Sequence, residues 1–385
     1  MEKKAKRLLF VLPTAQIGGT RTSLLNLIAN MDKERYHIDV MFIRNKGTVL
    51  KQFEDACNVL PQDKVLLAGR ETVSVLLKSG KIGAFIKSLC FVAKSKIQKQ
   101  SRYEIAYKQA AKNYDNKYDC VIAYQEKDAS EFARYIKAPR KIAWVHSKYN
   151  GGAEKLRAVY DCFDKVIFVS DGIMGEYIDS GAADANRSIR IYNTFNQSAP
   201  LELCDSYKVN RFKENCPLIV SVGRCAQEKG FDRVIDASLK LKKEGIDFEW
   251  VIVGGGSLLT QFKTKVEQLG LSENVFFVGY KENPYPYIFN ADFVVVSSTT
   301  ESFSLVCLEA AALKKPIVVT DYPAAHEVVV DGKMGIICPN SAEGVYDGVK
   351  RMISDCELRQ QIVEYLDDFN YDNQGIVEQV YQVVE

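Results

Sequence analysis

The stretch LIVSVGRCAQEKGFDRVIDASLKLKKEG, residues 218–245, decides the fold. It opens with a short apolar run typical of a buried strand, and it passes through a glycine turn into apolar residues at helical spacing. A second apolar run, FEWVIV at 248–253, follows directly. A strand, a helix and a strand in this order predict one βα repeat of a parallel sheet.

The same alternation occurs along the whole chain. Its short apolar runs are LLFVL at 8–12, IDVMFI at 38–43, CVIAY at 120–124, IAWV at 142–145, KVIFV at 165–169, LIVSV at 218–222, FEWVIV at 248–253, NVFFV at 274–278, DFVVV at 292–296 and PIVVT at 316–320. Residues 196–217 show neither the periodicity of a strand nor that of a helix, which predicts a linker between two series of strands. We therefore expect an α/β protein with two Rossmann-like, doubly wound parallel-sheet domains, 1–200 and 201–385, the last helix being able to pack back on the first domain.

Length and composition exclude several classes of protein. The chain has 385 residues, which exceeds the roughly 250–300 at which a single core stops growing. Hydrophobic residues make up 47% and charged residues 26%, as in an ordinary globular protein. No apolar run reaches the roughly 18–20 residues of a membrane span. The ten cysteines form no C-x-x-C pair and only three histidines are present, which argues against a zinc site and favours buried thiols in the cytoplasm.

The loops that follow the predicted strands carry candidate binding residues, because parallel sheets bind ligands beyond the carboxyl ends of their strands. Arg224 and Lys229 flank the turn that ends in Gly230, just before a helix. Cations at this positive end of a helix are unfavourable unless an anion completes the site, which suggests a bound phosphate. Two solvated surface cations are the alternative. The glycines at 254–256 offer a second loop with room for a backbone-bound anion.

Two glutamates flank the start of another predicted helix. Glu301 lies in the loop after the strand at 292–296, Ser304 is a candidate N-cap, and Glu309 lies in the helix that follows. Helical spacing places Glu309 on a face shared with Leu305 and Leu313, where a carboxylate needs a partner. Taken alone, the stretch is also compatible with a structural cap and salt bridge.

The first half offers two further candidates. Gly18 and Gly19 follow the first strand and lead into an amphipathic helix, so their amides are able to approach a phosphate, although a plain tight turn is an equal alternative. His146 lies at the carboxyl end of a strand, where it is either a hydrogen-bonded structural residue or a site residue.

In order and spacing, several of these segments resemble the family 4 retaining glycosyltransferases of the GT-B fold (glycosyl transferases group 1). The matching segments are Gly18-Gly19, His146, GRCAQEKG at 223–230, GGG at 254–256, VGY at 278–280 and ESFSLVCLEA at 301–310. The resemblance is strongest from Leu218 to Asp331. It implies two Rossmann-like domains facing each other across a cleft, a nucleotide-sugar donor held mainly by the second domain, and neither a metal nor a further cofactor.

The resemblance also implies a role for each second-domain candidate. Arg224 and Lys229 would neutralise the donor diphosphate as negative charge grows on the leaving group. Glu309 would accept hydrogen bonds from the ribose hydroxyls, and Glu301 would hold a sugar hydroxyl. The remaining donor contacts would come from the backbone of Phe303, Ser304 and Leu305, from the glycine loop around Gly255, and from Tyr280 beside the base.

In the first domain the resemblance gives Gly19, next to Gly18, an amide contact with the diphosphate, and it gives His146 a contact with a hydroxyl of the transferred sugar. Retention by front-face attack is the mechanism it favours, in which a donor phosphate oxygen takes the acceptor proton. This chain departs from the family at Arg21, where Glu or Gln is usual, at IYNTFN (191–196), where Pro-Asn-Gly-Val is usual, and in the serines of ESFSLV. These departures bear on the donor sugar and on the first-domain contacts.

The segment from Lys78 to Lys112 carries nine Lys or Arg and one acid, Glu104. Apolar residues recur in it at helical spacing, beginning with Ile82. A basic amphipathic helix of this kind is able to lie on an anionic membrane surface, whereas the alternative is a solvated face over core residues. We expect a cytoplasmic protein, peripheral at the inner face of the cell membrane. No nucleic-acid-binding module is present.

The function expected from the sequence is hexose transfer from a nucleotide-diphosphate sugar, preferably a UDP-sugar, to a cell-surface glycan or lipid-linked acceptor. Two alternatives stay open: a non-catalytic glycosyltransferase-like binding partner, and a nucleotide-sugar epimerase of the same fold. The presence of Arg224, Lys229, Glu301 and Glu309 argues against the non-catalytic alternative.

Overall fold

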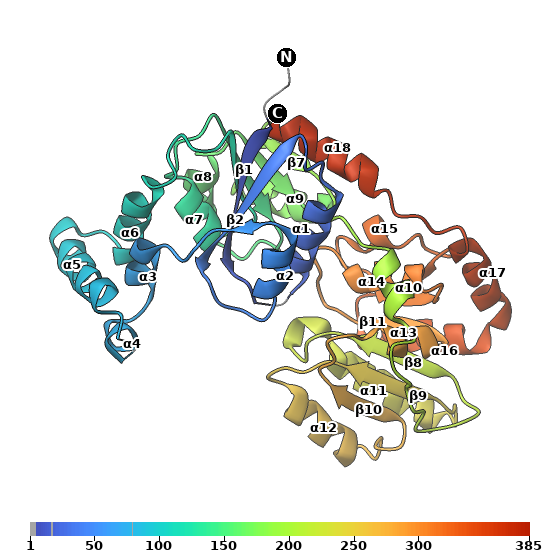
Figure 1. Ribbon diagram of the computed structural model, residues 1–385. Coiled ribbons are helices and arrows are strands. Elements are labelled where there is room, and N and C mark those ends of the chain that lie inside the picture. Colours follow the sequence, from blue (N-terminus) through green and yellow to red (C-terminus); the bar gives the residue numbers. More distant parts are fainter. Residues whose placement is uncertain (1–4, 17, 79) are drawn as a thin grey trace. The chain divides into compact units, whose positions relative to one another are not determined.

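The computed structural model describes residues 5–16, 18–78 and 80–385 (Figure 1). The chain divides into two compact units, residues 1–194 with 373–385, and residues 195–372. The expected boundary at residue 200 lies inside helix α10 (Ser198–Leu203) of the second unit. The last helix, α18 (Asn373–Val384), belongs to the first unit, where the backbone N–H of Asp32 donates to the Tyr381 hydroxyl at 2.7 Å.

The first unit is built on a seven-stranded parallel sheet in the order β3-β2-β1-β4-β5-β6-β7. The order reverses between β1 and β4, which is the place where doubly wound sheets bind ligands. The elements are β1 (Lys6–Thr14), α1 (Gly19–Asn30), β2 (Tyr36–Arg44), α2 (Leu50–Ala56), β3 (Asn58–Val59), α3 (Lys64–Arg70), α4 (Val73–Lys78), α5 (Ile82–Gln98), α6 (Arg102–Ala111), β4 (Cys120–Ala123), α7 (Asp128–Ala133), β5 (Arg140–Val145), α8 (Ala153–Tyr160), β6 (Lys165–Phe168), α9 (Asp171–Asp179), β7 (Ser188–Arg190) and α18.

The second unit is built on a six-stranded parallel sheet in the order β10-β9-β8-β11-β12-β13. Its order reverses between β8 and β11. The elements are α10, β8 (Leu218–Val222), the 3-10 turn η1 (Gln227–Lys229), α11 (Phe231–Lys243), β9 (Glu249–Val253), α12 (Leu259–Gln268), β10 (Val275–Gly279), α13 (Tyr285–Asn290), β11 (Phe293–Val296), α14 (Leu305–Ala312), β12 (Ile317–Thr320), α15 (Ala325–Val328), β13 (Gly335–Cys338), α16 (Ala342–Ser354) and α17 (Cys356–Leu366).

The fold predicted from the sequence is confirmed: each unit is a doubly wound parallel sheet, and all ten predicted strands form. Central strands are buried because helices cover both faces of such sheets; in β9, every residue from Glu249 to Val253 is buried. Three short strands, β3, β7 and β13, were not predicted. All three are edge strands, and β3 and β7 have two and three residues, too few for a periodic pattern.

The basic segment at 78–112 does not form the single amphipathic helix that its sequence suggested; most of it lies in two helices, α5 and α6. It is broken at Lys99, which has a left-handed backbone (φ 50°). Helix α6 packs into the unit through buried Ile105 and Ala106, and its Lys108 pairs with Glu104 at 2.8 Å. Helices α4 and α5 pack on each other at the edge of the unit, away from the sheet, and α5 also contacts α3 and α6 (Figure 1). In the described part of this segment, Lys108 is paired, whereas the lysines of α5 form no ion pair.

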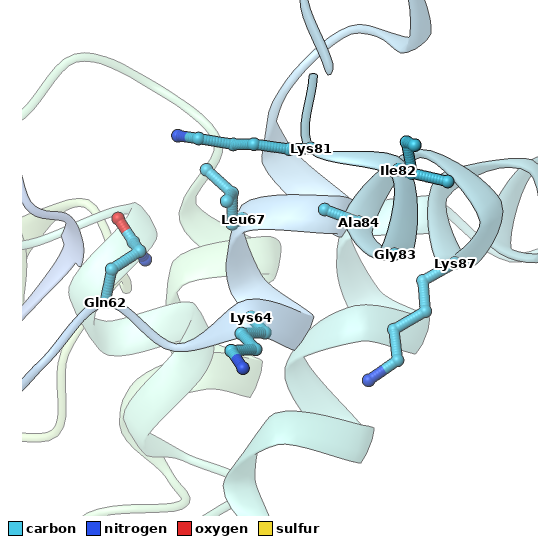
Figure 2. A pocket seen from close by; sticks show the side chains of 8 residues that line it. All are labelled: Gln62, Lys64, Leu67, Lys81, Ile82, Gly83, Ala84 and Lys87. Atoms are coloured by element: carbon cyan, nitrogen blue, oxygen red, sulfur yellow. The ribbon is translucent and has the colours of Figure 1, made fainter. Parts of the chain in front are cut away.

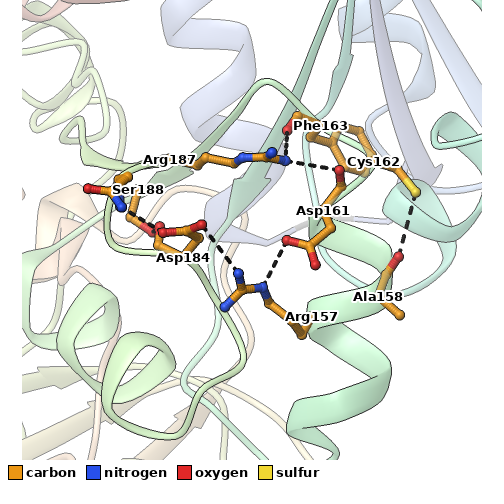
Figure 3. Close-up of polar contacts among 9 residues, drawn as sticks. Arg157, Ala158, Asp161, Cys162, Phe163, Asp184, Arg187 and Ser188 are labelled. Atoms are coloured by element: carbon orange, nitrogen blue, oxygen red, sulfur yellow. Dashed lines mark hydrogen bonds and ion pairs between the residues drawn. The ribbon is translucent and has the colours of Figure 1, made fainter.

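A polar cluster holds the start of the edge strand β7 (Figure 3). Arg157 on α8 pairs with Asp161 at 2.8 Å and with Asp184 at 3.2 Å. Arg187 donates to the Asp161 carbonyl at 3.0 Å, and the Ser188 hydroxyl donates to the Asp184 carbonyl at 2.8 Å. The cluster lies before β6 and β7, at the amino ends of these strands, so it stabilises the edge of the sheet and takes no part in the site described below.

Within the described ranges, no helix combines the length and the apolar character needed to cross a bilayer.

Candidate functional site

The second unit places most of the predicted residues at the reversal of its strand order. The loop after β8 carries Arg224 and Lys229, and the loop after β11 carries Glu301 and leads into α14, which carries Glu309. Because β8 and β11 are neighbours in the sheet, their carboxyl ends bring these two loops together. The sequence placed the four residues on the right loops, and the sheet order explains why they meet.

Two glycines allow the loops of the second unit to approach each other closely. Gly230 has a left-handed backbone (φ 63°), and a Cβ there would lie 2.2 Å from the carbonyl oxygen of Ser297. A Cβ on Gly254 would lie 1.7 Å from the carbonyl oxygen of Gly223. Any other residue at these positions would push the loops apart, so the glycines determine where Lys229 lies relative to the end of β11.

Lys229 and Glu301 form an ion pair. The Lys229 Nζ lies 2.5 Å from Glu301 Oε1, and the side chains are 22% and 16% exposed. The Ser298 hydroxyl donates to the same carboxylate oxygen at 2.7 Å. The resemblance gave these two residues separate ligand contacts, whereas the structure pairs them with each other. An anion that reaches Lys229 therefore competes with Glu301 for the ammonium group.

Arg224 is more accessible than Lys229. Its side chain is 70% exposed, and its Nη2 lies 2.7 Å from Glu228 Oε1 in the same turn. An exposed pair of this kind contributes little to stability, since both partners remain solvated. The guanidinium is thus free to exchange Glu228 for another anion at small cost.

Glu309 has an unusual environment. Burial raises the pKa of its carboxyl to about 7, although Lys229 and a hydrogen bond with Tyr285 act in the opposite direction. The half-buried carboxyl of Glu309 on α14 was expected to need a partner, and Tyr285 on α13 lies beside it. Because the pKa lies near neutrality, a ligand that donates hydrogen bonds to the ionised form would convert Glu309 fully to the carboxylate.

The amino end of α14 begins directly after Ser304. This residue occupies the N-cap position with an extended backbone, as predicted, but its side chain makes no capping hydrogen bond. Phe303 is buried under this turn at 9% exposure, and Leu305 opens the helix. The first N–H groups of a helix have no partner within the helix, so this terminus offers backbone donors to an anion.

Gly255 and Tyr280 lie together at the carboxyl ends of β9 and β10. The Gly254 amide donates to the Gly279 carbonyl at 2.9 Å, and a Cβ on Gly255 would lie 3.5 Å from the Tyr280 Cβ. The Tyr280 side chain is 59% exposed, which leaves its ring accessible to a planar ligand group.

The first unit gathers its candidates at the carboxyl ends of β1 and β5. Gly18 precedes α1 with φ 156°, a conformation rare for other residues, and nothing lies within 4 Å of a Cβ built on Gly18 or on Gly19. His146 follows β5 and is 8% exposed, and its backbone N–H donates to Glu126 Oε2 at 3.0 Å. Burial, with Arg21 nearby, lowers the pKa of the imidazole to about 3, so it is neutral at physiological pH.

The His146 ring has an unused nitrogen. Among the described residues, its buried Nε2 has no hydrogen-bond partner, and the ring packs against Tyr124, at 4.6 Å between centroids, with Trp144 at 6.1 Å. A buried polar atom without a partner is costly, so this nitrogen is available to a ligand hydroxyl.

Some residues of the site were not identified from the sequence. Glu126 holds the His146 backbone, Tyr285 partners Glu309, and Ser298 supports Glu301. The position of Glu126, two residues after a predicted strand that ends at 124, was a usable signal. The pairings of Tyr285 and Ser298 depend on contacts between different loops and have no local pattern.

The second unit also matches a known family. Residues 205–368 match the family model "Glycosyl transferases group 1". The chain is 30% identical over 151 residues to the alpha-D-kanosaminyltransferase of Streptomyces kanamyceticus, a match that covers 38% of this chain and 39% of that protein. It is 25% identical over 223 residues to the N-acetylgalactosamine-N,N'-diacetylbacillosaminyl-diphospho-undecaprenol 4-alpha-N-acetylgalactosaminyltransferase of Campylobacter jejuni, covering 57% of this chain and 59% of that one. The matches thus span about two to three fifths of these relatives.

The structural similarity extends over the whole chain. HepE from Anabaena, solved in complex with UDP and glucose, has a TM-score of 0.74 at 17% identity, covering 98% of this chain and 99% of that one. The apo form of the lipopolysaccharide outer core galactosyltransferase WaaB has a TM-score of 0.64 at 16% identity, with the same coverage. At these identities the similarity concerns the fold. The comparisons thus show that the whole chain has the GT-B fold of two Rossmann-like domains, and that its second unit is similar to the glycosyl transferases group 1 family.

Proposed function

We propose that this protein is a retaining glycosyltransferase that moves a hexose from a UDP-sugar to a glycan or lipid-linked acceptor without a metal ion. The observation that carries the proposal is that the loop after β8, with Arg224 and Lys229, lies next to Glu301 on the loop after β11 and Glu309 on α14. Among the related proteins, HepE was solved with UDP and glucose, and the name of the Campylobacter enzyme specifies a diphospho-undecaprenol acceptor.

The donor would be held from both ends by groups on these loops. Arg224 and Lys229 neutralise the diphosphate, and the backbone amides at the start of α14 donate to it. Glu309 accepts hydrogen bonds from the ribose hydroxyls, and the base lies beside Tyr280 and the glycines around Gly255. Arg224 and Tyr280 are exposed, whereas Lys229 has to exchange its ion pair with Glu301 for the diphosphate.

Binding would exchange the partners of Lys229. The diphosphate takes the ammonium group from Glu301, and Glu301 then accepts a hydrogen bond from a sugar hydroxyl instead. The ion pair thus keeps both charges in place before the donor arrives. Ser298 continues to hold the Glu301 carboxylate through its hydroxyl during this exchange.

In the transfer step, the bond between the anomeric carbon and the diphosphate oxygen breaks, and the acceptor oxygen forms its bond on the same face of the sugar. The proton of the acceptor hydroxyl passes to a phosphate oxygen of the leaving UDP. Arg224 and Lys229 stabilise the negative charge that grows on this leaving group. His146 is a neutral imidazole and does not serve as the catalytic base.

A panel of nucleotide sugars tests the proposal. The donor should raise the melting temperature of the purified protein, because a ligand that binds only the folded state stabilises it by mass action. Incubation with that donor and a lipid-linked glycan acceptor should then give a product with the donor's anomeric configuration, at the same rate with and without a chelator. The proposal fails if no UDP-sugar stabilises the protein, if the donor alone is epimerised, or if a chelator abolishes turnover and magnesium restores it.

A further inference from the structure

Arg21, near the start of α1, carries a positive charge that its surroundings do not balance. Its Nε donates to the Thr14 carbonyl at 2.9 Å, which holds the guanidinium at the carboxyl end of β1. In the described part of the first unit Arg21 forms no ion pair, whereas Arg70 and Arg157 both pair with aspartates. Arg21 is also half-buried. A charge in such surroundings is costly unless an anion completes the site.

The acid nearest in effect, Glu126, attracts Arg21 without neutralising it. Burial lowers the pKa of Arg21, and Glu126 acts in the opposite direction, but the two side chains form no ion pair. The Glu126 carboxylate is buried and already engaged, because its Oε2 accepts from the His146 backbone N–H at 3.0 Å. The guanidinium therefore keeps its capacity to bind another anion.

Further positive charge lies at the same corner of the sheet. Arg44 is the last residue of β2 and the register partner of Thr14, and Lys46 follows two residues later. The Lys46 carbonyl accepts from the backbone N–H of Ala15 at 2.9 Å, so the loops after β1 and β2 lie against each other. Neither Arg44 nor Lys46 pairs with an acid in the ranges that the structure describes. The excess of positive charge at this corner attracts an anionic ligand.

The His146 imidazole also has an unused group at this edge of the sheet. Burial lowers its pKa to about 3, and Arg21 lies near enough to add to this effect, so the ring is neutral. Within residues 5–16, 18–78 and 80–385, its buried Nε2 has no hydrogen-bond partner. A neutral imidazole nitrogen forms a hydrogen bond with a hydroxyl group. Arg21 and His146 are thus complementary to a ligand that presents an anionic group beside a hydroxyl.

The shape of the guanidinium favours a carboxylate as this anionic group. Nε is engaged by Thr14, and neither terminal nitrogen of Arg21 has a hydrogen-bond partner in the described chain. The terminal nitrogens form a planar fork that matches the two oxygens of a carboxylate. The strand order reverses between β1 and β4 at this place, where doubly wound sheets bind ligands. A hexuronic acid presents a carboxylate and, on the neighbouring ring carbon, a hydroxyl.

We propose that Arg21 selects a sugar acid: its guanidinium binds the carboxylate of a hexuronic acid, and His146 binds a neighbouring hydroxyl. The acid belongs either to the UDP-sugar donor or to the acceptor glycan, which present the same chemistry to this site. The inference rests on the proposed sugar transfer, because it specifies a chemical property of one of the two substrates. It makes Arg21 a residue that determines specificity and gives it no part in the transfer of the proton.

Pairs of ligands that differ in a single group test the proposal with the full-length protein. UDP-glucuronic acid and UDP-glucose form the donor pair, and methyl glucuronide and methyl glucoside form the acceptor pair; the galacto epimers are measured alongside. The acid of at least one pair should bind about tenfold to a hundredfold more tightly than its neutral partner, as a charge-assisted bidentate contact provides. A preference in the donor pair assigns the acid to the donor, and a preference in the acceptor pair alone assigns it to the acceptor. Equal binding within every pair would overturn the proposal.

Two substitutions of Arg21 separate its charge from its shape. Arg21→Gln should abolish the preference for the acid and leave binding of the neutral partner nearly unchanged. Arg21→Lys keeps the charge without the fork, so it should retain only part of the preference. The control Lys64→Gln removes the same charge from an exposed residue of the unit and should keep the full preference. Lys64 lines a separate pocket with Lys81 and Lys87, between α3 and α5 (Figure 2). A preference that survives Arg21→Gln, or that Lys64→Gln weakens equally, would contradict the assignment.

A phosphate site at Arg21 is distinguished by measuring inorganic phosphate and UDP on the same variants. Their binding should not change in Arg21→Gln. If it is lost while the wild type shows no preference for an acid, the group bound at Arg21 is a phosphate and the proposal is wrong. Melting temperatures of the ligand-free variants separate lost binding from lost folding. If Arg21→Gln does not fold, Arg21→Lys and the ligand pairs on the wild type still decide the question.

Failure of this inference is distinguishable from failure of the proposed transfer. If a UDP-sugar binds and is turned over while acid and neutral ligands bind equally, only the role of Arg21 is wrong. If no UDP-sugar stabilises the protein, the transfer fails, and the methyl glycosides, which contain no nucleotide, still show whether Arg21 binds a sugar acid.

Discussion

Replacing Glu309 with Gln should remove a pH dependence of stability that this carboxyl creates. In the folded protein the pKa of Glu309 is raised to about 7 by burial, from an ordinary value of 4.5. Gln has nearly the same shape and can keep a hydrogen bond with Tyr285, but it cannot ionise. The substitution therefore separates the charge of Glu309 from its packing.

The sign and size of this pH dependence of the unfolding free energy follow from the linkage between proton binding and folding. Below pH 4.5 Glu309 is protonated in both the folded and the unfolded state, so its ionisation does not alter the free energy of unfolding. Between about pH 4.5 and 7 the folded state holds a proton that the unfolded state has released, so the free energy of unfolding falls as the pH rises. The difference in pKa corresponds to a total loss of about 3 kcal/mol above pH 7, most of which falls between pH 5 and 8.

Urea unfolding of the ligand-free protein across this pH range is the assay. The free energy of unfolding of Glu309→Gln minus that of the wild type should rise with pH by about 2–3 kcal/mol, and all other titrating groups cancel in this difference. Glu273→Gln, which alters an exposed glutamate of the same unit, should give a difference that is constant with pH. If the Glu309→Gln and wild-type curves run parallel, the carboxyl is not buried as described and the reasoning fails.

Three further predictions concern the same loops and the first unit. Arg224→Ala and Lys229→Ala should each lower kcat about a hundredfold through lost leaving-group stabilisation, whereas Lys243→Ala at the far end of α11 should not; near-normal turnover of either site variant would refute the assignment. Gly230→Ala should cost about 2–3 kcal/mol in urea unfolding, because a Cβ there meets a carbonyl oxygen on a left-handed backbone, and a cost below about 0.5 kcal/mol would contradict this. His146→Gln should leave the shape of the pH–rate profile between pH 5 and 8 unchanged, since the imidazole is already neutral there; loss of an ionisation would identify His146 as the titrating group.

Most of the fold was predictable from the sequence. A parallel strand that is buried on both faces of its sheet consists almost entirely of apolar residues, so it appears in the sequence as a continuous apolar run. LIVSV, for example, coincides with β8 from Leu218 to Val222. Edge strands do not carry this signal: Ser188–Arg190 forms β7 with only partial burial of its three residues. The break at Lys99 was also invisible, because a left-handed residue other than Gly has no strong sequence signature.

The sequence predicted which residues of the candidate site follow which strand, but it did not predict which of these residues pair with each other. Arg224, Lys229, Glu301 and Glu309 stand at positions where the order of strands and turns already predicted a ligand. The bond between Lys229 and Glu301 joins loops 72 residues apart in the sequence, and it exists because β8 and β11 are neighbours. Strand order is a property of the whole sheet, so no local pattern contains this information.

The charges of the second-unit site balance before any ligand binds, and this has a consequence for how it selects one. Lys229 pairs with Glu301 and Arg224 with Glu228, while a pKa near 7 leaves Glu309 partly neutral. A phosphate alone must break an ion pair and leaves Glu301 without a partner, which is unfavourable for a carboxylate that is only 16% exposed. A ligand that also presents hydroxyls beside its diphosphate satisfies the displaced carboxylate. For the donor proposed above, a sugar hydroxyl would replace the contact that Glu301 loses, so we expect a nucleotide sugar to bind more tightly than inorganic phosphate or a bare nucleotide.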